Sequence, residues 1–172
     1  MPDLTPLWIS IKVGFISTII VSILGIFICR TLYKRKGHAT QFLESLILLP
    51  IVLPPTVLGF ILIIIFSPRT FVGQFFQNIL HLPVVFTMTG AVIASVIVSF
   101  PLMYQHTIQG FRSINPKMLN TARTMGASER KIFYRLILPL SKRSIIAGIM
   151  MSFARAIGEF GATLMVAGYI PN

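Results

Sequence analysis

The chain has 172 residues, of which 55% are hydrophobic and 11% are charged, and its mean hydropathy is +0.84. Soluble domains carry about 25% charged residues, so this composition excludes an ordinary soluble domain and indicates an integral membrane protein. The net charge of +11 comes from 15 Lys and Arg residues against 4 acidic ones. Because these charges lie in short segments between apolar runs, they indicate the positive-inside pattern and not a nucleic-acid-binding surface.

Four apolar runs are long enough to cross a membrane, since a helical span needs about 20 residues at roughly 1.5 Å each. The predicted spans comprise residues 7–29, 42–66, 90–108 and 144–167. Twelve of the 15 basic residues lie within 30–36 and 112–143, so both segments are expected in the cytoplasm and the N-terminus outside. We predict an all-α, multi-pass protein of the cell membrane, in contact with lipid, with residues 1–172 as a single transmembrane domain.

The second apolar run contains three prolines, Pro50, Pro54 and Pro55. Each proline removes a backbone donor, so together they are expected to break the helix at membrane depth. The carbonyl groups freed by such a break are tolerated only where they are buried in protein or face a wet cavity. Two interpretations stay open. The break is a kink that shapes helix packing, or Pro54 and Pro55 belong to a bendable segment that lines a transport pathway.

A basic, polar segment separates the third and fourth apolar runs. Asn115 followed by Pro116 predicts a helix start, because the Asn115 side chain can cap a free N–H group and proline has a preset φ. Gly126 is expected to end that helix and Ser128 to begin another. Since Ala122 lies four residues before Gly126, we predict that the two share one nearly flat helix face, which lets a partner's backbone come close.

A longer pattern runs through residues 115–139. The sequence has Asn-Thr-Ala, three residues, Gly, nine residues and then Leu-Ile-Leu-Pro. This resembles the EAA loop of ABC importer permeases, which has Glu-Ala-Ala, Gly and Ile-x-Leu-Pro at the same spacing. The resemblance implies a coupling segment that docks in a cleft on a separate ATPase subunit. The residues carried over to this role are Asn120, Thr121, Ala122, Gly126, Leu138 and Pro139, of which Asn120 and Thr121 depart from the family's pattern.

Two charged residues, Arg155 and Glu159, lie four apart inside the fourth apolar run. An unpaired charge at mid-span costs about 2.5–3.5 kcal/mol on insertion scales, and residues at this spacing reach each other on one helix face. The two are therefore predicted to pair. Whether the pair only neutralises itself between helices, or whether Arg155 also favours anions in a pathway, stays open.

The sequence predicts no catalytic, cofactor or metal site. It has no Gly-x4-Gly-Lys-Ser/Thr phosphate loop, its only cysteine is Cys29, and its three histidines are far apart. If ATP drives this protein, hydrolysis is expected on another chain, so the protein itself is not expected to be an enzyme.

The proline run of the second span and the run Arg-x-x-Gly-Glu-Phe-Gly-Ala around Arg155 are similar to those of oxyanion permeases, and closest to molybdate permeases. This resemblance implies a homodimeric permease of an ATP-driven molybdate importer, with two ATPase subunits and an extracytoplasmic molybdate-binding protein. It also implies a fifth span, so we expect the chain to be truncated after Asn172. The alternatives are a sulfate or tungstate permease and, from a different class, a channel-like or regulatory membrane subunit without an ATPase. The pattern in residues 115–139 favours the permease, because a channel needs no docking helix.

Overall fold

The computed structural model describes residues 5–35, 37–79 and 84–158, and the regular structure in these ranges is helical throughout. The elements are α1 Thr5–Leu32, α2 His38–Val52, α3 Pro55–Ile65, α4 Phe71–Gln74, η1 Phe75–Ile79, α5 Met88–Arg112, α6 Pro116–Thr124, α7 Glu129–Ile132, η2 Phe133–Ile137, α8 Leu138–Leu140 and α9 Lys142–Ile157. Of these, η1 and η2 are π-helical turns, in which the hydrogen bonds span one residue more than in an α-helix. The predicted all-α class is confirmed.

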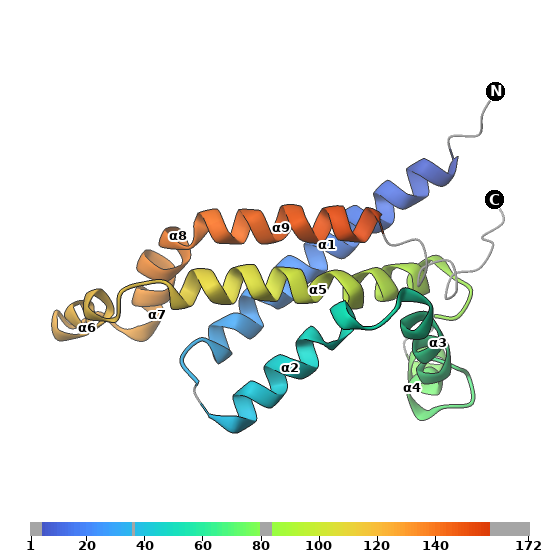
Figure 1. Cartoon of the computed structure of the whole chain (residues 1–172), viewed down its shortest axis with the longest axis horizontal. Coiled ribbons are helices and arrows are strands. Elements are labelled where there is room, and N and C mark those ends of the chain that lie inside the picture. Colours follow the sequence, from blue (N-terminus) through green and yellow to red (C-terminus); the bar gives the residue numbers. More distant parts are fainter. Residues whose placement is uncertain (1–4, 36, 80–83, 159–172) are drawn as a thin grey trace.

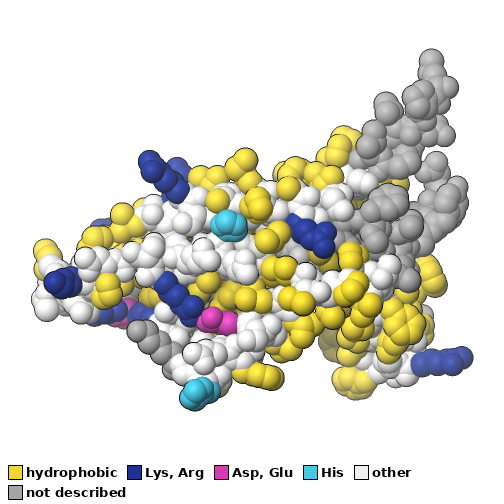
Figure 2. All heavy atoms as spheres, viewed as in Figure 1, with side chains coloured by type: hydrophobic (Ala, Val, Ile, Leu, Met, Phe, Trp, Pro, Cys, Tyr) yellow, Lys and Arg dark blue, Asp and Glu magenta, His cyan; other side chains and the backbone are white. Residues whose placement is uncertain are grey.

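The centre of the molecule is α5, which packs against α1, α9 and α2, while α1 also packs against α9. These helices run along the length of the molecule, with α6, α7 and α8 at one end and α3 and α4 at the other (Figure 1). On the face shown in Figure 2, Lys and Arg side chains lie mainly toward the end with α6 to α8, while a few lie within the other half, where hydrophobic side chains predominate. This separation of charge from apolar surface is the arrangement expected of a membrane protein.

Among the described residues, two helical stretches are long and apolar enough to cross a membrane by themselves, Trp8–Leu32 and Met88–Arg112. Up to four spans result if each of two bent pairs counts as one, namely α2 with α3, and residues 129–140 with α9. The bends are 115° and 66°. The predicted second span, residues 42–66, is therefore two helices and not one continuous rod. The last part of the predicted fourth span, from residue 159 on, lies outside the described residues.

The prolines explain the first bend, though not all three act alike. Leu53 is extended, with φ −72° and ψ 137°, and Pro55 occupies the first turn of α3. An extended residue before a Pro-Pro pair ends one helix, and proline at a first helical position starts the next. Pro50, in contrast, lies inside α2. The expectation that all three prolines break the helix was wrong for Pro50. Proline lacks the backbone N–H of this position, but Pro50 lies in the last turn of α2, and the helix continues past it to Val52.

Small residues allow close packing in the bundle of α1, α5 and α9. A Cβ atom at Gly25 of α1 would lie 2.7 Å from Met103 Cγ of α5, and one at Gly148 of α9 would lie 3.0 Å from Met103 Sδ. The Ser152 hydroxyl of α9 donates to the Ser99 carbonyl of α5 at 3.2 Å. Close contacts at small residues and hydroxyl bonds between helices are what stabilises helix association where lipid removes the hydrophobic driving force.

Candidate functional site

The coupling segment, residues 115–139, begins with a capped helix. The Asn115 side chain accepts a hydrogen bond from the Lys117 N–H at 2.9 Å, and Pro116 is the first residue of α6. This cap satisfies one of the N–H groups that a helix start leaves without a partner. The predicted helix start is confirmed.

The end of α6 is a Schellman motif. Gly126 has a φ of +80°, a left-handed conformation that glycine adopts without a Cβ penalty. The Ala127 N–H donates to the Ala122 carbonyl at 3.0 Å, and the Gly126 N–H donates to the Arg123 carbonyl at 2.9 Å. Ser128 then caps α7, accepting from the Lys131 N–H. Gly126 as a stop and Ser128 as a start are both confirmed.

The predicted flat face formed by Ala122 and Gly126 was wrong. Gly126 lies two residues beyond the last residue of α6, Thr124, so it does not continue the helical spacing. Ala122 is half-buried and packs against the apolar core beneath the segment. The four-residue rule holds only inside a helix, and the same glycine that was expected to end α6 cannot also lie on its face.

An apolar core joins the coupling segment to the bundle. Leu119, Ile132 and Ile137 are buried in one cluster together with Leu32 at the end of α1 and Phe111 near the end of α5. Buried apolar side chains of this kind each contribute about 1.5–3 kcal/mol. The segment is therefore seated on the bundle and is not a free loop.

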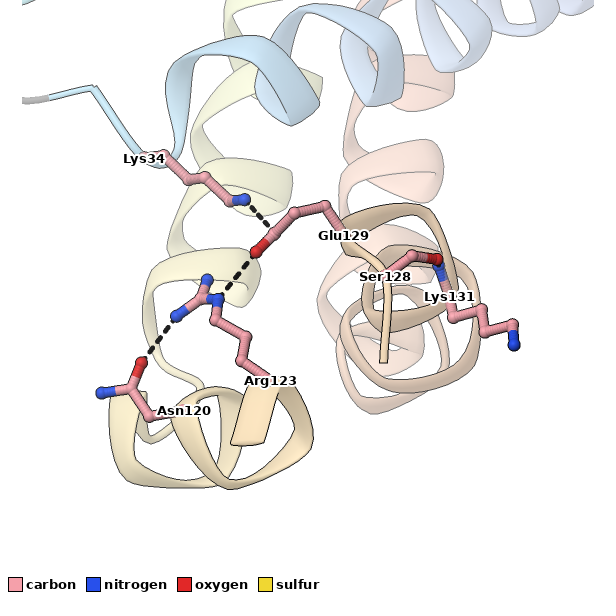
Figure 3. A network of polar contacts seen from close by, with 6 residues as sticks. All are labelled: Lys34, Asn120, Arg123, Ser128, Glu129 and Lys131. Carbon is pink, nitrogen blue, oxygen red and sulfur yellow. Dashed lines mark hydrogen bonds and ion pairs between the residues drawn. The ribbon is translucent and has the colours of Figure 1, made fainter. Parts of the chain in front are cut away.

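Above this core, one carboxylate connects three elements (Figure 3). Glu129 of α7 pairs through one oxygen with the Lys34 ammonium, just beyond α1, and through the other with Arg123 Nε of α6 at 2.7 Å. Arg123 also donates to the Asn120 side-chain oxygen at 2.6 Å. The bond from Arg123, followed by that from Lys34, lowers the pKa of the Glu129 carboxyl to about 2. The group is therefore a carboxylate at neutral pH.

Sequence reasoning did not find this network, because Lys34 and Glu129 are 95 residues apart. One signal was present, since Glu129 is the only acidic residue among the eight basic ones of residues 112–143. The same reasoning placed Asn120 among the coupling residues. In the structure its side-chain oxygen is engaged within the segment, by Arg123.

The outer surface of the segment combines exposed methionines with cations. Met118 and Met125 are 39% and 81% exposed. Lys117, Arg130 and Lys131 are exposed as well, and none of the three has a carboxylate partner within the part of the chain that the structure describes. A surface of this kind fits a partner that offers an apolar contact surrounded by acidic side chains.

A cleft of about 830 Å³ opens beside the segment. Its lining comes from the connection between α1 and α2, the first turns of α2, the end of α5 and the inner side of α6, and includes Lys34, Thr40, Gln41, Phe111, Ile114 and Leu119. Glu44 of α2 and Arg112 of α5 also line it, and both guanidinium NH groups of Arg112 donate to the Glu44 carboxylate. The cleft therefore separates α2 from α6, and an ion pair crosses it between α2 and α5.

The remaining predicted residues occupy different places. Thr121 is exposed on α6, Leu138 is half-buried against the core, and Pro139 is exposed in α8. Pro54 and Pro55 are exposed at the bend between α2 and α3, on a part of the molecule remote from α6 (Figure 1). Arg155 is half-buried in the last turn of α9, and its predicted partner Glu159 lies outside the described residues.

The chain belongs to the family of binding-protein-dependent transport system inner membrane components, which matches residues 21–171. The putative molybdenum transport system permease protein YvgM of Bacillus subtilis (strain 168) is 46% identical over 168 residues, 98% of this chain and 74% of its own length. The molybdenum transport system permease protein ModB of Escherichia coli (strain K12) is 33% identical over 171 residues, 99% of this chain and 75% of its own. A probable sulfate transport system permease protein, cysT of Chlorokybus atmophyticus, is 29% identical over 95% of this chain and 57% of its own length.

The family match covers the helical bundle and the coupling segment together. Members are inner membrane components of transport systems, which confirms the membrane location expected from composition. The resemblance found in the sequence, to permeases of ABC importers, is confirmed as well.

Proposed function

We propose that this chain is the permease subunit of an ATP-driven molybdate importer. The observation that carries the proposal is the 46% identity, along 98% of the chain, to a putative molybdenum transport permease. The bundle supports it, because its apolar helices are of membrane-spanning length. The capped, core-supported coupling segment supports it too, because a docking element must keep its shape while its partner moves.

The assembly that we propose follows the family's description as binding-protein-dependent. Two copies of the permease form a homodimer, and the translocation pathway lies at the two-fold axis between them. Two ATPase subunits bind the coupling segments in the cytoplasm, and an extracytoplasmic molybdate-binding protein delivers the anion to the face that carries the N-terminus. The positive charge of residues 30–36 and 112–143 supports this orientation.

The structure refines which coupling residues are proposed to touch the ATPase. Thr121 lies three residues after Met118 on α6, and the N–H of Met125, the residue that follows α6, still donates to the Thr121 carbonyl at 3.0 Å, so the three form one exposed stripe. We propose this stripe as the docking surface, with an acidic rim on the ATPase opposite Lys117 and Arg130. The other coupling residues, Asn120, Ala122, Gly126, Leu138 and Pro139, then act indirectly, by giving the segment its shape and its seat on the core.

The docking surface is tested by Met125→Glu with Met125→Gln as its matched control. The side chain is 81% exposed, so both variants should fold as the wild type does. Against an acidic partner only the glutamate adds repulsion. We expect Met125→Glu to reduce co-purification of the ATPase and molybdate uptake, and Met125→Gln to keep most of both. Equal binding and uptake in the two variants would remove α6 from the docking surface.

The substrate is tested by uptake into proteoliposomes that contain the permease and its ATPase, with binding protein loaded with molybdate, tungstate or sulfate. Molybdate uptake is expected. Uptake of sulfate alone would favour the alternative that the similarity to a sulfate permease supports. Selectivity is a difference in affinities, and we propose that the closed binding protein supplies most of it.

Within the pathway we propose four residues, Pro54, Pro55, Arg155 and Glu159. The 115° bend at the prolines frees backbone carbonyls at a helix end, and Arg155 is a half-buried cation in an apolar helix. An intramembrane ionisable residue is a functional candidate by default. The double variant Arg155→Gln/Glu159→Gln separates a structural role of the pair from a role in the pathway. If its uptake per folded molecule equals that of the wild type, the pair has a structural role only.

A further inference from the structure

Glu129 makes contacts that its position in the sequence does not suggest. Its two oxygens bind cations from different parts of the chain, Lys34 in the turn that directly follows α1 and Arg123 on α6, while Glu129 itself begins α7 (Figure 3). One side chain therefore connects the first helix of the bundle with both helices of the coupling segment.

A second connection lies beside the first. Arg30, in the last turns of α1, places its guanidinium 4.7 Å from the ring centre of Phe133 and 5.4 Å from that of Tyr134, and donates to the Tyr134 hydroxyl at 3.3 Å. Arg30 of α1 and Lys34 of the turn after it are four residues apart, so this end of α1 meets the coupling segment through two cations, at the start of α7 and in η2. These contacts are made at the end of a helix whose earlier turns pack against α5 and α9.

The stability of the segment does not require these ion pairs. The side chains of Lys34, Glu129 and Arg123 are 43%, 53% and 39% exposed, and exposed pairs contribute little to folding. The buried core of Leu119, Ile132 and Ile137 holds the segment on the bundle without them. What the carboxylate adds is a fixed orientation, because it binds α6 and α1 at the same point.

We propose that Glu129 is a positioning residue that makes the end of α1 follow the coupling segment. This inference rests on the proposed function, in which an ATPase displaces that segment. A displacement of α6 moves Arg123 and the carboxylate bound to it, and the carboxylate moves Lys34. The motion then enters α1, a helix that extends along the bundle toward the opposite end of the molecule (Figure 1). Coupling between distant sites needs such a contiguous set of contacts between rigid elements.

The test uses the whole transporter, with its ATPase and binding protein, in proteoliposomes. For Glu129→Gln we expect ATPase co-purification and ATP hydrolysis close to wild type, and molybdate uptake per ATP lower by at least about fivefold, the lower end of typical coupling between sites. Lys34→Gln should act in the same direction. The matched control is Arg35→Gln, which removes one exposed positive charge from the adjacent position and should keep the wild-type ratio.

The rescue separates positioning from general damage. The rescue is Lys34→Arg, which restores a cation opposite the Glu129 carboxylate where Lys34→Gln removes it, and it should regain most of the uptake per ATP. An unchanged ratio in Glu129→Gln, or a loss in Lys34→Arg as large as that in Lys34→Gln, would overturn the proposal. If Glu129→Gln lowers the amount of monodisperse protein, Lys34→Gln provides the test instead. In that variant the ion pair between Glu129 and Arg123 remains. If the proposed function itself is wrong, the wild type fails to bind the ATPase or to take up molybdate, so the two failures are distinct.

Discussion

The bundle and the coupling segment are held in place by different interactions. In the bundle, α1, α5 and α9 meet through buried small residues, a fully buried methionine and a hydroxyl bond between helices. In the coupling segment, a small apolar core lies under helix caps and exposed ion pairs. Packing of the first kind tolerates little change in shape, whereas the exposed pairs add little to stability and instead orient the segment on its small core. The bundle is thus suited to transmit motion and the segment to receive it.

The largest effect is expected where the bundle is tightest. In Gly25→Leu the added Cβ alone would lie 2.7 Å from Met103 Cγ, and overpacking of a core costs typically about 1–3 kcal/mol. We expect much less monodisperse protein after gel filtration in detergent, and faster loss on heating.

Two comparisons make this prediction specific. Ile23→Leu introduces the same side chain two residues away, at a position that is 65% exposed, and should have no effect. Adding Met103→Ala to Gly25→Leu should restore part of the lost protein, because it removes the atoms in conflict. A loss of equal size at Ile23 would show that the bundle has no special tightness at Gly25.

A smaller effect is expected at the start of α6. Asn115→Ala removes the cap on the Lys117 N–H, a change that costs about 0.5–2 kcal/mol of helix stability. Hydrogen exchange at Lys117 and Met118 should become faster, while exchange in α5 stays as it was. Asn115→Asp retains an oxygen acceptor and should remain close to wild type, so equal exchange in both variants would contradict a capping role.

The smallest effect concerns pH. The pKa of Glu129 is lowered from 4.5 to about 2 by its two cations, so its contribution to stability is complete above the unfolded value and is lost as the pH falls from about 4.5 to 2. Since the Glu129 side chain is 53% exposed, we expect the two pairs to contribute little to stability. NMR titration of labelled glutamate side chains should place Glu129 near 2, and Arg123→Gln should raise its pKa toward the ordinary value. A titration near 4.5 in the wild type would show that the pairs do not persist in solution.

Local rules predicted the local features well. Asn115, Gly126 and Ser128 were expected as caps and stops, and each depends on chemistry within a few residues of itself. The break at Pro54 and Pro55 was expected for the same reason. Its 115° angle was not, because a bend is set by what the two helices pack against.

Features that depend on distant parts of the chain were missed or misread. Lys34 and Glu129 are brought together only when α1 packs against α5 and α9, which no spacing rule reveals. Ala122 was assigned to an outward face, yet the side of α6 that it occupies is fixed by the buried Leu119 and the core below. Which residues of α6 face a partner depends on how α6 packs against this core, and the sequence alone does not show that packing.

The π-helical turn η2 has a consequence for the length of the chain. It accommodates one residue more than an α-helical turn between Ile132 and Leu138. A deletion of one residue there could be absorbed by tightening the turn, with no hydrogen bond lost, but it would rotate everything before the turn by about 100° relative to α9. Ile132 would then leave the core and the exposed stripe of α6 would turn with it. The nine-residue gap after Gly126 is therefore a constraint on length, in addition to those on the identity of the residues within it.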